Sequence, residues 1–426
     1  MRLPADHPER VLLNDEVHAR PPEPLSAPSR VSYLALYADA AAREQAWQAV
    51  HDLAVRFGAA PPQPGANHYS ADLGPFRLRW ERHTEFVRYS FIAPGGEDAF
   101  ADPVMAAVPA DWVAALPGRL MVAAHVALVR DGDPPADPAD LSRRLFAGTV
   151  PVGAGVLEAA GAAFTDFRIH PDGFSRVLVL DRAMTPGQAG RTVQRLLEID
   201  TYRMVALLAL PVAQASAPVI TRCERELAGI TAAMVTAGEA DDPALLERLT
   251  RLAAEIDSRQ ADNLYRFSAS VAYDELVHRR IAELRESRLP GLQTWQEFTD
   301  RRFAPAMNTC RSVAARQEEL SRRVARATQL LATRVGVTRE RQNQSVLEVM
   351  NRRVKLQLRL QTAVEGFSIA AVTYYIVGLV GYVAKALKAA GVPVEPDVAM
   401  GVSIPVVAAL MALGVRRTRR LVSRSD

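Results

Sequence analysis

Three chemically active side chains stand at alternating positions near the start of the chain. Within the polar run Asn14–Pro21 they are Glu16, His18 and Arg20. Alternate side chains of an extended segment point to the same side, so these three would share one face. A carboxylate, an imidazole and a guanidinium together can bind an anion or a metal ion, or transfer protons. The alternative, which we favour, is an N-terminal arm whose charged groups pair with the rest of the protein.

A second candidate pair is Glu275 and His278, whose Glu-x-x-His spacing places both side chains on one face of a helix. Di-iron bundles use this spacing, but they need a second copy and further carboxylates, and this chain has no second copy. We therefore expect a surface pair. Phosphate-binding glycine loops, zinc signatures and the Gly-x-Ser-x-Gly elbow are also missing from the sequence. We predict no catalytic residue, no metal site and no cofactor, and hence a protein that is not an enzyme.

Near the C-terminus, Gly366–Ala384 and Val398–Val415 are apolar stretches without charged residues. As helices, each would measure roughly 27 Å, close to the thickness of the hydrocarbon core of a bilayer. Cytoplasmic flanks of membrane helices are enriched in Lys and Arg. We therefore expect a transmembrane hairpin of about 366–384 and 398–415, with both chain termini in the cytoplasm. The basic residues on its outer flanks are Arg352, Arg353, Lys355, Arg359, Arg416, Arg417, Arg419, Arg420 and Arg424.

Small and aromatic residues recur at helical spacing in the first of these stretches. Tyr374, Gly378 and Tyr382 are four residues apart, and Gly381 is adjacent. Small residues let helices approach closely in lipid, so this surface can pack within one hairpin or between hairpins.

Glu365 lies at the expected cytoplasmic mouth of the first membrane helix. In an oligomer, a carboxylate at this depth can line the entrance of a pore. We favour the simpler alternative, an ion pair with Arg359 or Arg416 at the membrane interface.

The charge of the chain is unevenly distributed. From Arg341 onward there are twelve Lys or Arg residues and five Asp or Glu residues, while the whole chain carries +3, so residues 1–340 carry −4. The basic character belongs to the membrane flanks, which argues against nucleic acid as a partner. The two cysteines, Cys223 and Cys310, show no metal-ligand spacing, as expected in a reducing compartment. The first twenty residues contain no apolar run typical of a signal peptide.

The prolines divide the chain into two kinds of sequence. Of the 28 prolines, 22 fall at or before Pro218, and none occurs between Pro305 and Pro393. We expect an α+β cytoplasmic domain over 1–215, a helical, coiled-coil-like stalk over 216–362, and the transmembrane hairpin with its basic tail over 363–426. In the first domain, alternation predicts strands at 31–37, 76–81, 86–92 and 120–129, and a hairpin at 164–180; helical periodicity predicts helices at 41–57 and 187–210.

Two apolar seams are predicted in the stalk. One consists of Val313, Leu320, Val324 and Leu331, and the other of Leu347, Met350, Val354 and Leu358. Gly336 is the only glycine between Ala306 and Thr362, so this stretch forms either one long helix or two helices joined there. No breaker separates the second seam from the first membrane helix, which predicts a stalk continuous with it.

Four strings along the chain together resemble a known family. They are Asn14–Pro21, Leu196–Met204, Tyr265–Ser270 and Leu358–Gly366. In this order they are similar to the bacterial membrane-anchored proteins grouped as domain-of-unknown-function family 3422. The resemblance implies a protein of the bacterial inner membrane and supplies no mechanism. The layout is also loosely similar to that of CorA-type magnesium transporters, although the Gly-Met-Asn motif of that family is replaced here by Tyr382-Val383-Ala384-Lys385.

From these observations we expect a membrane-anchored, non-enzymatic protein that forms homo-oligomers through its stalk. Its expected partners are the lipid bilayer and further copies of the same chain. An ion-conducting oligomer, with Glu365 and the Tyr374 face near the pore, is the alternative. An acid–base or metal-dependent enzyme that uses Glu16 and His18 is a third possibility.

Overall fold

The computed structural model describes residues 4, 6–11, 13–14, 21–95, 100–132, 137–391 and 393–422. The chain forms two compact units, which are described separately. The first contains residues 1–236 and 245–328, and the second contains 237–244 and 329–426. The domain boundaries predicted from the sequence, near 215 and 362, do not coincide with the borders of these compact units and stay predictions.

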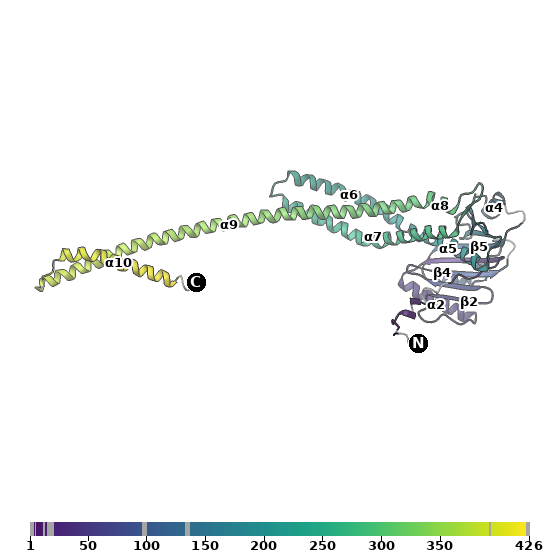
Figure 1. Ribbon diagram of the computed structural model, residues 1–426, viewed down its shortest axis with the longest axis horizontal. Coiled ribbons are helices and arrows are strands. Elements are labelled where there is room, and N and C mark those ends of the chain that lie inside the picture. The colour runs from purple at the N-terminus through teal and green to yellow at the C-terminus, as the bar shows by residue number, and fades with distance from the viewer. Residues whose placement is uncertain are drawn as a thin grey trace. The chain divides into compact units, whose positions relative to one another are not determined.

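The first unit is built on one sheet of nine strands (Figure 1). All neighbouring strands are antiparallel except β5 and β8, which are parallel. In spatial order the strands are β2 (His68–Asp72), β3 (Arg77–Arg82), β4 (Phe86–Pro94), β1 (Ser29–Tyr37), β5 (Arg119–Arg130), β8 (Ser175–Asp181), β7 (Gly161–Thr165), β6 (Val152–Val156) and β9 (Ser287–Arg288).

The strands predicted from alternation are confirmed as β1, β3, β4 and β5. The predicted hairpin is confirmed as β7 and β8, although β7 ends at Thr165 rather than near Ile169. Its turn is closed by hydrogen bonds from the amide of Gly173 to the carbonyl oxygen of His170 and from the amide of His170 to that of Phe174. The predictions missed β2, β6 and β9, which are short.

The two faces of the β3–β4 hairpin have opposite character. Leu78 and Trp80 of β3, with Tyr89 of β4, belong to an apolar core that also contains Val50 and Leu53 of helix α2 (Ala40–Arg56). The alternate residues point to the other face and include charged side chains, namely Arg79 and Glu81 of β3 and Arg88 of β4. That face is covered by helix α5 (Pro186–Leu207), which contacts β1 and β5 and begins at a capping box between Thr185 and Gln188. Glu81 and Arg88 on this face are therefore enclosed rather than solvated.

Short helices complete the first unit around the sheet. They are η1 (Val104–Ala107), α3 (Ala110–Ala114), α4 (Pro138–Leu145) and α8 (Trp295–Arg302).

Three long helices lie side by side at one end of the sheet in the first unit (Figure 1). They are α6 (Ala209–Thr236), α7 (Asp242–Leu284) and, up to residue 328, α9 (Ala304–Ala389). Arg316 of α9 pairs with Glu224 of α6 at 2.7 Å (Nη2–Oε2). Val313, Leu320 and Val324 are buried. The first predicted seam is therefore covered within the chain itself.

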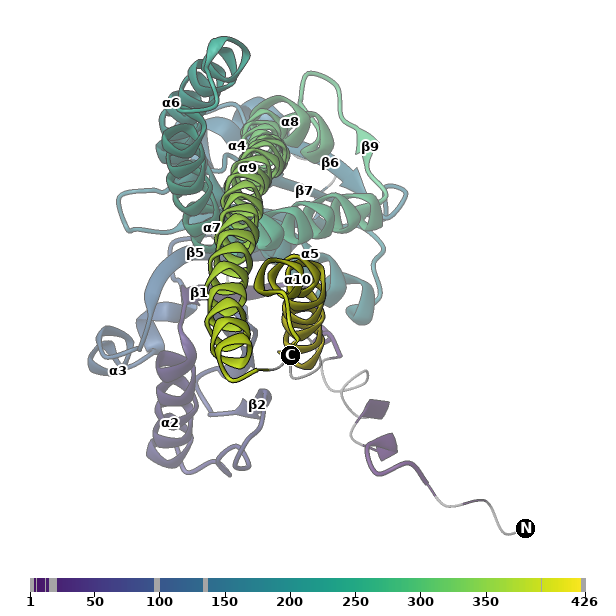
Figure 2. The same cartoon turned by 90° about the vertical axis from the view of Figure 1, so that its left-hand side faces the viewer.

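The second unit consists mainly of helix. From residue 329, α9 continues to Ala389 without a break at Gly336, which decides in favour of one long helix. α10 (Pro396–Val422) turns back and lies beside the last turns of α9 (Figures 1 and 2). The segment 237–244 is held to α9 by Asp242, whose Oδ2 lies 2.7 Å from Nε of Arg334.

Candidate functional site

The sequence-predicted residues of the N-terminal cluster, Glu16, His18 and Arg20, lie outside the described residues. In helix α7, His278 lies beside Asp274 rather than beside Glu275, with which it was predicted to pair. Glu275 is exposed, and His278 instead lies 3.6 Å (Nε2–Oδ1) from Asp274, a buried carboxylate that also pairs with Arg311. Asp274 is four residues before His278 and therefore also shares its helix face.

The most concentrated chemistry in the first unit is a chain of buried ion pairs between the sheet and α5. It begins in the β3–β4 hairpin, where Glu81 and Arg88 are direct cross-strand partners. Oε1 of Glu81 accepts a hydrogen bond from Nε of Arg79 at 2.7 Å, and Oε2 accepts one from Nε of Arg88 at 2.9 Å. Glu81 and Arg88 are both buried. The hairpin register thus holds the first carboxylate between two guanidinium groups.

Arg88 also reaches across to α5. Its Nη1 lies 2.9 Å from Oε1 of Glu198, which accepts a further hydrogen bond from Nε2 of Gln194 at 2.7 Å. The other carboxylate oxygen of Glu198 accepts a hydrogen bond from Nε of Arg280 in α7 at 2.5 Å. Arg280 then pairs with Glu283 at 3.0 Å (Nη1–Oε2). Positive and negative groups alternate along the chain, so each buried charge has a partner of opposite sign.

The surroundings of these charges shift their protonation equilibria in one direction. Burial by itself raises the pKa of Glu81, but the charge of Arg88 and the neighbouring His83 and Arg79 outweigh it and hold that pKa well below its usual range. Burial likewise raises the pKa of Glu198, and Arg88 and Arg280 bring it below the ordinary value. Both carboxylates are therefore ionised at neutral pH.

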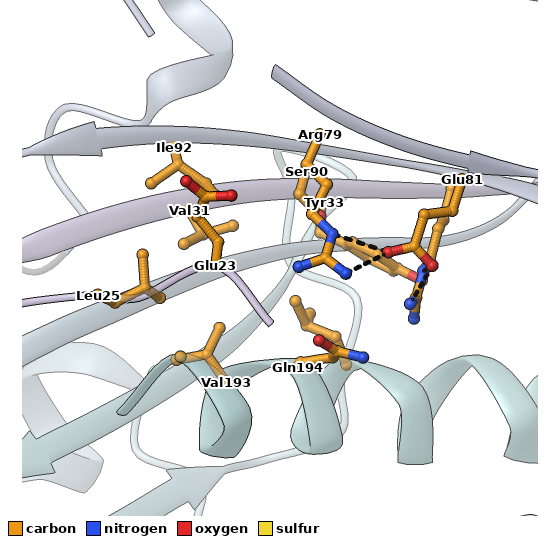
Figure 3. Close-up of a pocket in the computed structure, with 13 residues that line it drawn as sticks. Glu23, Leu25, Val31, Tyr33, Arg79, Glu81, Ser90, Ile92, Val193 and Gln194 are labelled. Atoms are coloured by element: carbon orange, nitrogen blue, oxygen red, sulfur yellow. Dashed lines mark hydrogen bonds and ion pairs between the residues drawn. The ribbon is translucent and has the colours of Figure 1, made fainter. Parts of the chain in front are cut away.

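A small cavity of about 40 Å³ opens beside this chain of ion pairs (Figure 3). Its floor is α5, from which Val193 and Gln194 point toward the sheet, and Glu23 and Leu25 close one side. Oε1 of Gln194 is buried without a hydrogen bond in the cavity wall. A cavity of this size holds water rather than a larger molecule. A wider groove of about 270 Å³ adjoins it and shares Glu23, Arg79 and Glu81.

The segment before β1 is pressed closely onto α5. The amide of Leu25 donates to the carbonyl oxygen of Pro186 at 2.9 Å. A Cβ atom at Gly190 would overlap the backbone oxygen of Glu23, so only glycine allows this approach. Pro21, which follows the predicted N-terminal cluster, lines the wider groove. A glycine within a helical pattern is the only local signal of this packing.

A separate buried histidine, His125, lies in β5 opposite Ser32 of β1. Nδ1 of His125 is 3.0 Å from Oγ of Ser32, which accepts a hydrogen bond from the amide of Met105 at 3.0 Å. The His125 ring stacks on Phe174 with a centroid distance of 3.9 Å. Burial lowers the pKa of His125 to about 4; nearby Asp172 opposes the shift and Arg176 adds to it. Because Ser32 is fully buried, the pair stabilises the fold and is closed to a substrate.

The residues predicted on the apolar surface of α9 separate into two groups in the second unit. Gly381 is buried, and a Cβ atom there would overlap Sδ of Met400 in α10. Tyr374 and Tyr382 are 78% and 75% exposed, and no atom lies within 4 Å of a Cβ placed at Gly378. Gly381 therefore belongs to the contact between α9 and α10, and the two tyrosines do not. Glu365 lies in the same helix and is half-buried.

Within the part of the chain that the structure describes, three helical stretches are long and apolar enough to cross a membrane, one more than the sequence predicted. They are Pro186–Thr236, Ala304–Ala389 and Pro396–Val415. The additional candidate is the α5–α6 pair, whose residues the predicted boundary at 215 divides between the cytoplasmic domain and the stalk.

Among the residues that the structure describes, no group of three or more His, Cys, Asp or Glu side chains is placed to hold a metal ion. The site is instead a network of paired charges within a mixed α+β unit, in a chain that ends in the long helices α9 and α10. The chain belongs to the DUF3422 family, described as "Protein of unknown function (DUF3422)", whose model matches residues 5–422. No curated protein and no solved structure matches the chain, so the looser likeness to CorA-type transporters has no support.

Proposed function

We propose that this chain is a non-enzymatic membrane-anchored protein, held by a hairpin of residues 366–384 and 398–415, whose copies associate through α9. The observation that carries the proposal is the exposure of its most apolar helices. Each candidate span contains an 18-residue stretch that is its most apolar part. The buried share of this stretch is 11% in α9 and 0% in α10, against 33% in the α5–α6 pair. Uncovered apolar helices of this length are stable in lipid and not in water.

The α5–α6 candidate is better explained by the first unit itself. Only four residues between Met204 and Thr221 are exposed, namely Pro211, Gln214, Ala215 and Pro218. Less than two turns before this run, α5 carries Glu198, whose charge is paired with Arg88 of the sheet. A helix tied to the sheet by a buried ion pair would have to break that pair to enter a bilayer, at a cost of several kcal/mol. We therefore propose two spans rather than three.

The orientation follows from the distribution of charge. Basic residues stand on the two outer flanks of the hairpin, including Arg352 before the first span and Arg417 after the second. The connection between the spans contains two lysines, Lys388 and Lys385, and two acidic residues, Glu395 and Asp397. By the positive-inside rule, the N- and C-termini lie in the cytoplasm and the connection lies outside. For a bacterial cell we propose the inner membrane as its location.

The charge network supports a structural role for the first unit. A general base works best with a pKa near the working pH, whereas the pKa values of Glu81 and Glu198 are held below their ordinary range. Both carboxylates are also saturated by guanidinium donors. These groups fasten the sheet to α5 and α7 and are not poised to exchange protons.

An ion-conducting oligomer is the second candidate. It is favoured by Tyr374 and Tyr382, whose side chains are exposed on the hairpin rather than packed against α10. A phenol hydroxyl in hydrocarbon needs a hydrogen-bond partner, which a neighbouring copy or a hydrated pathway would provide. This candidate predicts ion flux in liposomes that falls on Glu365→Ala or Tyr374→Phe. Flux that is missing from the unaltered protein rejects it.

Membrane anchoring is tested with the full chain in cells. Carbonate washing should leave the protein in the membrane pellet, and its recovery in the soluble fraction would reject the proposal. For orientation, an Ala390→Cys variant in the connection should react with an impermeant maleimide added outside spheroplasts. A Val235→Cys variant, exposed on α6, should react only after lysis. The reverse labelling pattern would overturn the proposed topology.

A further inference from the structure

The exposed side chains of α9 just before the first proposed span form a wide apolar face. Nine of the nineteen residues from 346 to 364 are large, apolar and between 50% and 66% exposed. They are Val346, Leu347, Val349, Met350, Val354, Leu356, Leu358, Leu360 and Val364. The earlier seam of the same helix is buried in the chain's own three-helix bundle, whereas this one has no cover within the described chain.

The face is directional. At about 100° per residue, the nine side chains fall within an arc of roughly 200° around the helix. Four charged residues lie together on the opposite side: Glu348, Arg352, Lys355 and Arg359. Arg353, Gln357 and Gln361 interrupt the apolar arc, and Gln357 is near its middle. A helix with one apolar and one charged side is built to pack against something on one side and to face water on the other.

The surface of the bilayer cannot be what packs against this apolar face. α9 runs from this segment into Gly366–Ala384 without a break. If 366–384 crosses the membrane, the preceding residues leave the bilayer along the same axis and cannot lie flat in the headgroup layer, as interfacial helices do. The apolar face must therefore pack against protein that lies beside the helix at the same height above the membrane.

We propose that this face joins more than two copies of the chain in a parallel, in-register bundle. The inference rests on the proposed membrane anchoring and adds the partner, its orientation and a minimum number of copies. Hairpins inserted in the same direction place Leu347 of every copy at the same height, so each face meets its own counterpart. A two-stranded coiled coil needs two apolar positions in seven, whereas bundle helices use three or more, as nine in nineteen do here. Gln357 would then stand inside the bundle, where a polar residue fixes the register.

The number of copies is tested first. The full chain in lipid nanodiscs should have at least three times the protomer mass of 46.5 kDa by mass photometry. A stable monomer or dimer would overturn the proposal.

The face is tested with two matched triple variants. Leu347→Ser with Met350→Ser and Val354→Ser should dissociate the oligomer, since three apolar contacts per copy are lost. Glu348→Ser with Arg352→Ser and Lys355→Ser makes the same number of changes on the charged side and should leave it assembled. If both triple variants dissociate the oligomer equally, the apolar face is not the surface that joins the copies.

Orientation and register are tested by cross-linking in membranes. A Met350→Cys variant should form a disulfide between copies, and a Lys355→Cys variant should not; the native cysteines are buried and give little background. Equal cross-linking at both positions contradicts the proposal. Carbonate washing of the same membranes keeps the two proposals apart. A protein that stays inserted but does not cross-link at Met350→Cys rejects the bundle alone, whereas a protein released by carbonate rejects the anchor.

Discussion

Nη1 of Arg88 lies 2.9 Å from Oε1 of Glu198 and joins β4 to α5 across the buried face of the sheet. Nε of the same guanidinium donates to Glu81 at 2.9 Å. One side chain thus pairs with two carboxylates that have almost no contact with solvent. Removing a buried partner leaves an uncompensated charge, which is far more damaging than losing an exposed pair.

The first prediction concerns this link. Arg88→Met should destabilise the first unit by about 3–5 kcal/mol because Glu81 and Glu198 lose their shared partner. Arg322→Met, which breaks the exposed pairs with Glu318 and Glu319, should change stability little. All four tryptophans lie in the first unit, so urea unfolding followed by their fluorescence measures it selectively. Similar midpoints for both variants would show that the network does not stabilise the fold.

The second prediction concerns the close approach of residues 21–27 to α5. Gly190→Ala should destabilise the first unit by about 1–3 kcal/mol, since the new methyl group overlaps the backbone of Glu23. Gly229→Ala in α6 meets no atom within 4 Å and should stabilise that helix by up to about 1 kcal/mol. The same fluorescence titration distinguishes them. Stabilisation by both substitutions would mean that the segment is not held against α5.

The third prediction follows from His125, whose pKa is lowered to about 4 by burial. In the unfolded chain the imidazole titrates near 6.5. The unfolded state therefore takes up the proton first, and stability that is complete above about pH 6.5 is lost as the pH falls toward 4. The loss amounts to at most roughly 3 kcal/mol. In His125→Gln this part of the pH dependence should vanish in urea titrations at pH 7 and 5, and an unchanged slope would assign it to other groups.

Alternation in the sequence predicted the two strands that carry Glu81 and Arg88, but not the register that pairs these residues. The register of the β3–β4 hairpin places these two residues opposite each other, and Trp80 opposite Tyr89 on the other face. The partner in α5 was not predictable in this way. Glu198 is 110 positions away from Arg88, and no local pattern specifies which helix covers the charged face.

The two seams of α9 show the same limit. Val324 and Val354 both belong to seams of coiled-coil type, yet the first is buried and the second is 53% exposed. The difference arises from α6 and α7, which accompany only the earlier part of α9. Periodicity indicates that a helix face needs cover, whereas the fold decides whether the chain itself provides it.

The last prediction concerns the contact between α9 and α10. From the sequence, the small residues of α9 could pack either within one hairpin or between hairpins. The hairpin itself uses Gly381, since a Cβ atom there would overlap Met400. Gly381→Val should loosen the hairpin and raise hydrogen exchange over residues 376–405 in the detergent-solubilised protein, because tight helix packing in lipid depends on small residues. Gly378→Val adds the same side chain where no atom lies within 4 Å and should leave exchange unchanged. Met400→Ala shortens the opposing side chain, so combining it with Gly381→Val should restore protection. If Gly378→Val disturbs the hairpin as much as Gly381→Val, the closest contact between the helices lies elsewhere.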